Sequence, residues 1–369
     1  MMTSPVNLLG MPRTDLERMF TDMGEKTFRA RQMMQWVYGR SVLSLDDMTD
    51  MSKSLRDSLG NRVGFTLPEV QERQDASDGV IKWQLRAGDA QAIETVFIPE
   101  ENRGTLCVSS QVGCAMDCPF CATGRQGFNR NLSAAEIVGQ VMLARRELAK
   151  SEYERVDGPR ISNVVFMGMG EPLANLRAVI EAVDILLDDL GFGLSRRRVT
   201  VSTSGLVPQL KKLGDAANVA LAVSLHAPND ELRDILVPIN RRHPIAELLA
   251  ACWDYALAAN LRAVTFEYVM LEGVNDSVEQ AHQLAGLLAN HPAKVNLIPF
   301  NPFPGSEYRR SSQKAVDRFR QVLLDAGIMT VTRKTRGDDI AAACGQLAGK
   351  VSNRVRVPLG GKMQQGILQ

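Results

Sequence analysis

The segment TLCVSSQVGCAMDCPFC, residues 105–121, contains the most informative pattern in this chain. It begins with a β-rich run and continues into a loop that carries three cysteines, Cys114, Cys118 and Cys121. Three thiolates on one tight loop can hold three irons of a 4Fe–4S cubane, which leaves the fourth iron open to a small molecule. A zinc knuckle and chance spacing are the alternatives, although structural zinc takes four ligands and no second Cys or His pair follows.

The composition is that of a globular protein. The 369 residues are 45% hydrophobic and 23% charged, which is too apolar for a disordered chain and too mixed for a fibrous one. No apolar stretch reaches the ~18 residues that span a bilayer, and the N-terminus has no basic segment leading into an apolar core. We therefore expect a cytoplasmic protein without membrane contact, whose six cysteines are reduced thiols, metal ligands or catalytic groups.

Charge is distributed unevenly along a chain whose formal net charge is only +1. Residues 309–369 hold 12 basic and 4 acidic residues. Overall neutrality argues against a protein that coats nucleic acid, whereas the basic end predicts a local surface for a polyanion, with a solvated helix and tail as the alternative. Further candidates for RNA contacts are Lys26, Arg29, Arg31, Arg196, Arg197, Arg198, Arg241 and Arg242, with Trp36 or Phe128 as stacking residues.

From residue 105 onward, β-rich runs alternate with helix-like stretches. Most runs are rich in Val, Ile, Leu and Phe with little alternation, as expected of parallel strands buried on both faces. Ser133 with Glu136 and Ser277 with Gln280 are potential capping boxes at the starts of two helices. Repeated strand–helix units predict an α/β fold, either a partial barrel or a full eight-fold one. The predicted strands are 105–109, 163–168, 198–203, 219–225, 263–270 and 294–299, with 328–333 as a further candidate.

The rest of the chain divides into three further regions. Residues 1–75 contain helical patterns at 16–23, 28–38, 45–48 and 52–59, which predict a small N-terminal helical domain that binds RNA. Residues 76–99 predict a β-hairpin linker, in which 80–85 and 92–98 flank the turn Ala87-Gly88-Asp89. Residues 100–337 are then the α/β core, and 338–369 form a C-terminal segment with a cysteine and a basic tail.

Small or polar residues gather at the carboxyl ends of four predicted strands. In a parallel sheet or barrel these ends meet on one side, where ligands bind. Each residue alone fits a cap or turn, and His226 alone fits a buried histidine, but their shared position predicts a site for a nucleoside and amino-acid ligand. The residues are Gly170, Glu171, Ser202, Ser224, Leu225, His226 and Asn301.

Three cysteines lie outside the loop. Cys107 is on the first core strand, Cys252 is in a helical stretch, and Cys344 is in RGDDIAAACGQL, residues 336–347. An isolated cysteine is most often a small buried hydrophobe, and we interpret Cys252 in that way. Cys344 differs because the small residues around it let its backbone approach a site closely, just after a basic run.

The C-x3-C-x2-C loop, with the aromatic Phe120 before its last cysteine, resembles the signature of the radical SAM superfamily. The resemblance implies a partial (β/α)6 radical SAM barrel, with Cys114, Cys118 and Cys121 holding a 4Fe–4S cluster. It also implies that the open iron chelates S-adenosylmethionine and that one-electron reduction yields a 5′-deoxyadenosyl radical. GMGEP, residues 168–172, is similar to the element that holds the amino group of this cofactor, and the strand-end residues would complete its site.

Longer segments resemble the RlmN/Cfr family of RNA methyltransferases over essentially the whole chain. The RlmN branch implies methylation of carbon 2 of adenosine in 23S rRNA, at the peptidyl transferase centre, and in tRNA, 3′ of the anticodon. It also implies a monomer and an electron donor such as flavodoxin. The segments are NLLGMPRTDLERMF (7–20), GEKTFRARQMMQWVY (24–38), GTLCVSSQVGC (104–114), GFNRNL (127–132), FMGMGEPL (166–173), SLHAP (224–228) and RGDDIAAACGQL (336–347).

The family resemblance implies roles for three further residues. One S-adenosylmethionine methylates Cys344, and the radical from a second removes hydrogen from that S-methyl group. The methylene radical adds to the adenine, and Cys107 then helps to break the protein–RNA adduct by removing a proton and forming a transient disulfide with Cys344. Glu94 matches a proton acceptor of the family, although from the sequence it could equally be an exposed strand residue.

Three other functions stay open at this point. A Cfr-type enzyme would methylate carbon 8, and only the full-chain similarity favours carbon 2. A non-catalytic iron–sulfur protein that binds RNA or transfers electrons would need neither Cys107 nor Cys344. A different radical SAM enzyme, such as a glycyl-radical activase, would need no methyl-carrying cysteine.

Overall fold

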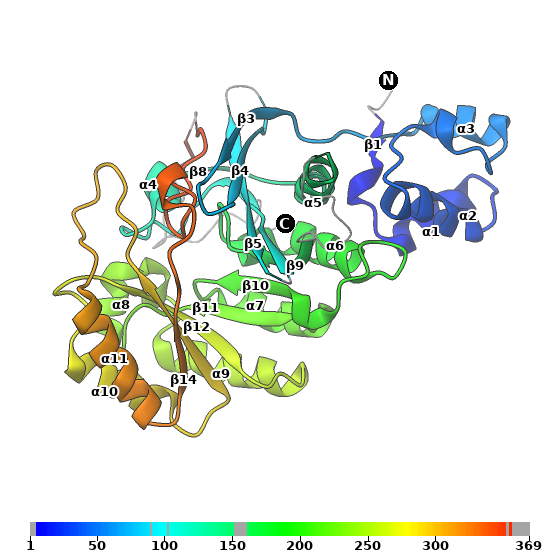
Figure 1. The fold of residues 1–369 in the computed structure, drawn as a ribbon. Coiled ribbons are helices and arrows are strands. Elements are labelled where there is room, and N and C mark those ends of the chain that lie inside the picture. Colours follow the sequence, from blue (N-terminus) through cyan, green and yellow to red (C-terminus); the bar gives the residue numbers. More distant parts are fainter. Residues whose placement is uncertain (1–4, 89–90, 102, 151–160, 352–353, 356–369) are drawn as a thin grey trace.

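The computed structural model describes residues 5–88, 91–101, 103–150, 161–351 and 354–355. Its centre is a ten-stranded sheet in the order β14-β13-β12-β11-β10-β9-β6-β5-β4-β3 (Figure 1). From β6 to β14 all neighbouring strands are parallel, and six strand–helix units are followed by one more strand. The predicted partial barrel is confirmed. Its parallel strands are β6 (Arg103–Cys107), β9 (Ile161–Phe166), β10 (Val199–Thr203), β11 (Ala220–Ser224), β12 (Val264–Met270), β13 (Ala293–Pro299) and β14 (Met329–Thr332).

Helices cover the outer side of this sheet (Figure 1). α11 packs on β13 and β14, α9 on β12 and α6 on β10. Both predicted capping boxes are present, at Ser133 before α5 and at Ser277 before α10. The helices of the barrel are α5 (Ala134–Ala149), α6 (Leu176–Leu187), α7 (Val207–Ala216), α8 (Asp230–Leu236), α9 (Ile245–Ala258), α10 (Val278–Leu288) and α11 (Gln313–Asp325).

The parallel strands alternate in polarity more than the sequence pattern suggested. On β10, Val199 and Val201 are fully buried, whereas Thr200 and Ser202 line cavities inside the barrel. β12 likewise directs Glu267 into the barrel. A strand turns successive side chains to opposite faces, so one face packs on helices and the other forms the interior of the barrel. The polar inner face is what makes a binding site possible here.

The predicted hairpin forms but is part of the main sheet. β4 (Ile81–Arg86) and β5 (Ala92–Glu100) are antiparallel, and β5 also pairs with β6. A further strand, β3 (Val70–Asp75), pairs with β4 and begins inside the region predicted to be helical. The segment is therefore an antiparallel extension of the barrel rather than a separate linker. Asp89, predicted in the turn, lies outside the described residues.

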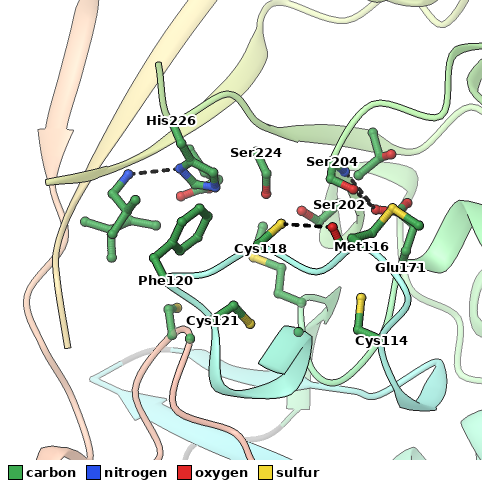
Figure 2. A pocket seen from close by; sticks show the side chains of 18 of the residues that line it. Cys114, Met116, Cys118, Phe120, Cys121, Glu171, Ser202, Ser204, Ser224 and His226 are labelled. Carbon is green, nitrogen blue, oxygen red and sulfur yellow. Dashed lines mark hydrogen bonds between the residues drawn. The ribbon is translucent and has the colours of Figure 1, made fainter. Parts of the chain in front are cut away.

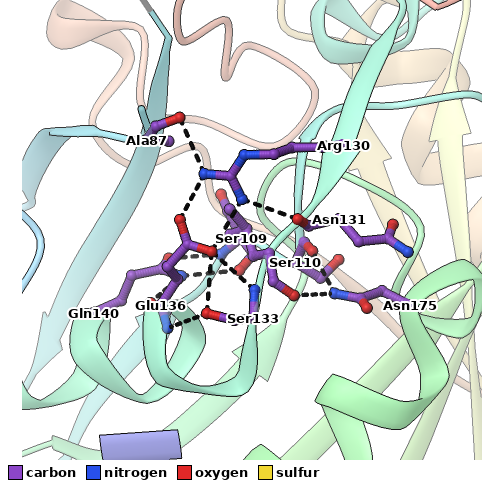
Figure 3. Close-up of polar contacts among 10 residues, drawn as sticks. Ala87, Ser109, Ser110, Arg130, Asn131, Ser133, Glu136, Gln140 and Asn175 are labelled. Carbon is purple, nitrogen blue, oxygen red and sulfur yellow. Dashed lines mark hydrogen bonds and ion pairs between the residues drawn. The ribbon is translucent and has the colours of Figure 1, made fainter. Parts of the chain in front are cut away.

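A buried polar network joins α5 to the start of the cysteine loop (Figure 3). Gln140 on α5 is fully buried, and its Oε1 accepts hydrogen bonds from Thr95 Oγ1 at 2.6 Å and Ser109 N at 2.8 Å. Its Nε2 donates to Ser109 O at 2.9 Å. Nearby, Arg130 and Glu136 form an ion pair of 2.7 Å. These contacts fix the backbone just before the cysteine loop.

The N-terminal helices lie at one end of the molecule, beside α5 and α6 (Figure 1). Arg13 forms ion pairs with Asp188 and Asp189, just after α6. Gly10 lies so close to α5 that a Cβ there would be 2.5 Å from Ala135 N. None of the helices in the described ranges is long and apolar enough to cross a membrane. The region comprises α1 (Arg13–Asp22), α2 (Phe28–Met34), α3 (Lys53–Gly60) and a parallel pair, β1 (Val6–Asn7) with β2 (Val63–Gly64).

After β14 the chain returns to the antiparallel extension. Arg336 pairs with Asp78 at 2.6 Å, just before β4. Lys350 forms an antiparallel bridge with Ala92, with hydrogen bonds of 2.8 and 2.9 Å. The segment that carries Cys344 is thus attached at both ends to the extension. Most of the predicted basic tail, residues 356–369, lies outside the described residues.

Candidate active site

The three loop cysteines lie between two short elements, β7 (Gln111–Gly113) and α4 (Ala122–Gln126). β7 pairs with β8 (Phe128–Asn131), which closes the loop at its base. Gly113 has a φ of +76°, and a Cβ there would be 1.9 Å from the carbonyl oxygen of Gly127. Only glycine fits this position, since it tolerates both the left-handed backbone and the close approach.

The loop and the strand ends face each other across a cavity of about 170 Å³. Figure 2 shows the cysteine loop on one side and the strand ends with Ser202, Ser224 and His226 on the other. Most of the predicted site residues therefore share one cavity. Those that line it are Cys114, Cys118, Cys121, Gly170, Glu171, Ser202, Ser224, His226 and Cys344.

The three loop cysteines have the donor chemistry that an iron–sulfur cluster requires. Burial raises the pKa of all three thiols, because their surroundings disfavour the thiolate. Iron cations would offset this effect and hold the thiols deprotonated. Among the described residues no group of three His, Cys, Asp and Glu side chains already forms a metal site. Their common loop and common cavity are what fit a cluster.

Glu171 is held firmly at the edge of the cavity. Its Oε2 accepts hydrogen bonds from Ser204 N at 2.8 Å and Ser204 Oγ at 2.6 Å, and its Oε1 accepts from Leu173 N at 3.1 Å. Burial raises the pKa of this carboxyl group. Because Gly170 has no side chain, its backbone can lie close to Gln111, where a Cβ on residue 170 would be 2.5 Å from Gln111 Cβ. A carboxylate so fixed can accept a further hydrogen bond from a ligand ammonium.

His226 is neutral and oriented by the backbone. Its Nδ1 accepts a hydrogen bond from Val269 N at 3.0 Å, which leaves Nε2 as the protonated nitrogen. Burial, with Arg233 nearby, lowers the pKa of His226 to about 3. Its ring packs edge-on against Phe120 of the cysteine loop, with centroids 4.7 Å apart. The histidine therefore offers a hydrogen-bond donor and an aromatic wall rather than a charge.

Two predicted cofactor residues do not line this cavity. Leu225 is fully buried, and its N–H donates to Glu267 O. Asn301 lines a second cavity, where its Nδ2 donates to Cys344 O at 3.1 Å. Asn301 thus positions the cysteine segment instead of facing the first cavity.

Cys344 lies where the two cavities meet, since it lines both of them. Its neighbour Gly345 accepts a hydrogen bond from Ala122 N at 2.8 Å, which ties the segment to the cluster loop. Cys107, at the end of β6, is buried and lines neither cavity. Burial, and next the charge of Cys344, raise the pKa of Cys107 to about 12.

The other sequence predictions had mixed outcomes. Cys252 is fully buried in α9, as expected. The alternative of an exposed Glu94 was wrong, because this side chain is buried. Phe128 is also buried, so it is not available to stack on a base in this conformation. Trp36 is partly exposed and lies under the guanidinium of Arg40, 4.0 Å from its ring centroid.

Sequence reasoning missed two buried basic residues. Lys82 Nζ lies 3.4 Å from Glu94 Oε1 and 3.3 Å from Ala341 O, so it joins the hairpin to the Cys344 segment. Arg233 on α8 is fully buried and donates to the backbone oxygens of Ser204, Ser224 and Leu225. It thereby holds the strand ends in place. No sequence pattern marks either residue, because their partners lie on other strands and loops that meet them only in the folded chain.

Comparison with known proteins agrees with this architecture. The ribosomal RNA large subunit methyltransferase N-terminal domain, of RlmN type, matches residues 6–64, and the radical SAM superfamily matches 108–285. A crystal structure of a radical SAM methyltransferase from Sphaerobacter thermophilus is 46% identical, with a TM-score of 0.85. The match covers 93% of this chain and 99% of that one.

Two further solved structures show a weaker similarity. Streptococcus suis SuiB bound to S-adenosylmethionine is 13% identical over 64% of this chain and 52% of that one, with a TM-score of 0.45. A domain of pyruvate-formate lyase-activating enzyme from Bacteroides vulgatus is 20% identical over 47% of this chain and 99% of that one, with a TM-score of 0.36. Neither likeness bears on function. The Sphaerobacter match and the two domain matches do bear on function. They show that the chain belongs to the radical SAM methyltransferases that carry an RlmN-type N-terminal domain.

Proposed function

We propose that this protein methylates carbon 2 of adenosine in 23S rRNA and in tRNA, using Cys344 as the carrier of the methyl group. Family membership supports an RNA methyltransferase that uses a 4Fe–4S cluster and S-adenosylmethionine. The observation that carries the finer proposal is the position of Cys344. Cys344 lines the same cavity as Cys114, Cys118 and Cys121, and the hydrogen bond from Ala122 N to Gly345 O at 2.8 Å joins its segment to the cysteine loop.

The chemistry of the target carbon explains why the enzyme needs a methyl-carrying cysteine in addition to the three loop cysteines. Carbon 2 of adenine lies between two ring nitrogens and is electron-poor, so it does not attack the methyl group of a sulfonium. The cluster and S-adenosylmethionine, when bound by the loop cysteines and the strand ends, supply a radical that can remove a hydrogen atom. The thiolate of Cys344 is the nucleophile that takes the methyl group first.

Cys344 and Cys107 then act in sequence. The S-methyl group of Cys344 loses one hydrogen atom, and its methylene carbon forms a bond to carbon 2. The adduct gives its carbon 2 proton to a base and one electron to a one-electron acceptor, a role that a cluster held by the loop cysteines would supply. The sulfur of Cys107 attacks the Cys344 sulfur and gives up its thiol proton, the carbon–sulfur bond breaks, and the carbon takes up a proton to become a methyl group. The product disulfide must be reduced before the next turnover.

Glu94 is proposed as the acceptor of the carbon 2 proton. Its carboxylate is buried beside the Cys344 segment and accepts a hydrogen bond from Ala348 N at 2.9 Å. It lines neither cavity in this structure, so direct proton transfer requires a shift of this segment. The same contacts suit a second task, which is to position the loop that carries Cys344.

Mass spectrometry of nucleosides tests the proposed function. Reconstituted enzyme, S-adenosylmethionine, a reductant and unmodified RNA should yield 2-methyladenosine. Formation of 8-methyladenosine would instead identify a Cfr-type enzyme, and no methyladenosine would refute the proposal. Cys344→Ala should keep the cluster absorbance and lose methylation, whereas Cys107→Ala should trap RNA covalently on the protein. Cys252→Ala, a buried cysteine outside the site, should methylate normally and serves as the matched control.

A further inference from the structure

Glu267 is a buried carboxylate inside the barrel that the proposed chemistry does not use. It lies in the middle of β12 with only 4% of its surface exposed. Its Oε1 accepts a hydrogen bond from Asn296 Nδ2 at 2.9 Å, whereas its Oε2 has no hydrogen-bond partner among the described residues. Arg333 Nη1 lies 4.0 Å from Oε2, which is beyond hydrogen-bond distance.

A buried carboxylate oxygen that accepts no hydrogen bond is a costly feature and calls for a physical reason. Burial raises the pKa of the Glu267 carboxyl group, and the nearby charge of Arg333 offsets this effect only in part. A ligand that donates a hydrogen bond to this oxygen would remove the cost. The side chain therefore indicates a ligand with an N–H or O–H group at this point.

The position of Glu267 places the ligand group that donates this hydrogen bond near Cys344. The side chain lines both the first cavity and the second, which has a volume of about 550 Å³. Arg333 and Cys344 line both cavities as well. A group that reaches Glu267 from the second cavity therefore comes to the junction where Cys344 lies.

The second cavity has the charge expected of a nucleotide site. Its wall contains more cationic than anionic side chains, so a phosphate can approach it favourably. Glu267 lines both this cavity and the first one. A base directed inward would thus meet Glu267 while its phosphates stay near the cations. The cationic residues are Arg103, Lys294, Arg333, Lys334 and Arg336, and the acidic ones are Glu100 and Glu267.

We propose that Glu267 accepts a hydrogen bond from the exocyclic amino group of the target adenine and so positions that base beside Cys344. The inference rests on the proposed function, which supplies the adenine. Guanine has a carbonyl oxygen at the same ring position, and two acceptors facing each other would repel. Glu267 therefore also makes the site selective for adenine over guanine.

S-adenosylmethionine carries an adenine amino group too, so it is the other source of this donor. The lining of the second cavity favours the RNA base, because cations attract its phosphates and repel the net positive charge of S-adenosylmethionine. The two sources are separated by measuring RNA preference and cofactor binding in the same variants.

The test compares two RNAs that differ in one group. One carries adenosine at the target position and the other carries purine riboside, which lacks only the amino group. With holoenzyme, reductant and S-adenosylmethionine, the wild type should favour adenosine in kcat/KM by on the order of tenfold. Glu267→Met, which has no acceptor, should use both RNAs within about twofold of each other. Glu267→Gln, whose amide oxygen still accepts, should restore part of the preference.

Controls separate this role from the alternatives. Glu272→Met removes an exposed carboxylate just after β12 and should keep the wild-type preference. Equilibrium dialysis of each variant measures S-adenosylmethionine binding in parallel. The inference is wrong if the wild type shows no preference, or if Glu267→Met keeps it, and weakened cofactor binding in the latter case would assign Glu267 to S-adenosylmethionine. A wild type that methylates neither RNA would refute the proposed function itself.

Discussion

The buried pair of Lys82 and Glu94 should control how firmly the Cys344 segment is attached to the barrel. Both side chains are more than nine-tenths buried. Lys82 comes from β4 and Glu94 from β5, and both also contact the segment, at Ala341 O and Ala348 N. Lys82→Met keeps the length of the side chain and removes its charge. It leaves the Glu94 carboxylate buried without a cation.

Removing one partner of a buried ion pair costs about 3 kcal/mol, because the remaining charge stays desolvated. The cost should fall mainly on the attachment of the segment, since both residues bridge to it. An opening free energy lowered by that amount raises the open fraction roughly 100-fold. Replacing Glu94 by Gln in the same chain removes the stranded charge. The double variant should therefore lose at least about 1 kcal/mol less than the sum of the single variants.

Hydrogen exchange read by mass spectrometry measures this directly. Peptides from residues 338–350 should exchange roughly 100-fold faster in Lys82→Met, while α10 peptides should be unchanged. The matched control is Lys150→Met, which breaks an exposed ion pair with Glu147 of 2.9 Å and should cost less than about 1 kcal/mol. Equal exchange of the 338–350 peptides in the two variants would refute the reasoning.

Three other substitutions test the local architecture. Gly113→Ala should lower the free energy of unfolding by about 3 kcal/mol or more, because its Cβ would lie 1.9 Å from a carbonyl oxygen. It should also abolish cluster assembly, which is measured by visible absorbance. The control Gly286→Ala, at a position with open space around it, should assemble the cluster normally. Gln140→Leu should lower the free energy of unfolding in urea by about 3 kcal/mol, since it leaves two buried backbone groups unpaired. Asn301→Ala should slow methylation of Cys344, measured on the tryptic peptide, by up to about tenfold while the cluster absorbance stays normal. An unaffected rate would show that the Asn301 contact does not position the cysteine.

The barrel could be predicted from the sequence because each strand and helix is specified locally. Val201 and Leu221 belong to apolar runs bounded by turn residues, and Ser133 and Ser277 mark helix starts by a three-residue spacing. The cysteine loop is likewise a contiguous pattern. Features of this kind need no knowledge of which segments meet in space.

The sites that the sequence did not reveal depend on pairing between distant segments. Lys82 meets the Cys344 segment across more than 250 positions, and Glu267 faces Arg333 only because β12 and the end of β14 lie in one barrel. The sequence predicts that Phe128 can stack on a base, but contacts with other segments bury its side chain. β3 was missed because all but one of its residues are exposed, so it lacks the alternation of a half-buried strand.

The central claim is that the methyl group reaches RNA through Cys344 as a methylene unit. The most direct measurement supplies S-adenosylmethionine with a fully deuterated methyl group and analyses the product nucleoside by mass spectrometry. Transfer through Cys344 predicts that the methyl group on carbon 2 retains two deuterium atoms, with its third hydrogen taken up when the carbon–sulfur bond breaks. A product methyl group that retains all three deuterium atoms would contradict the account.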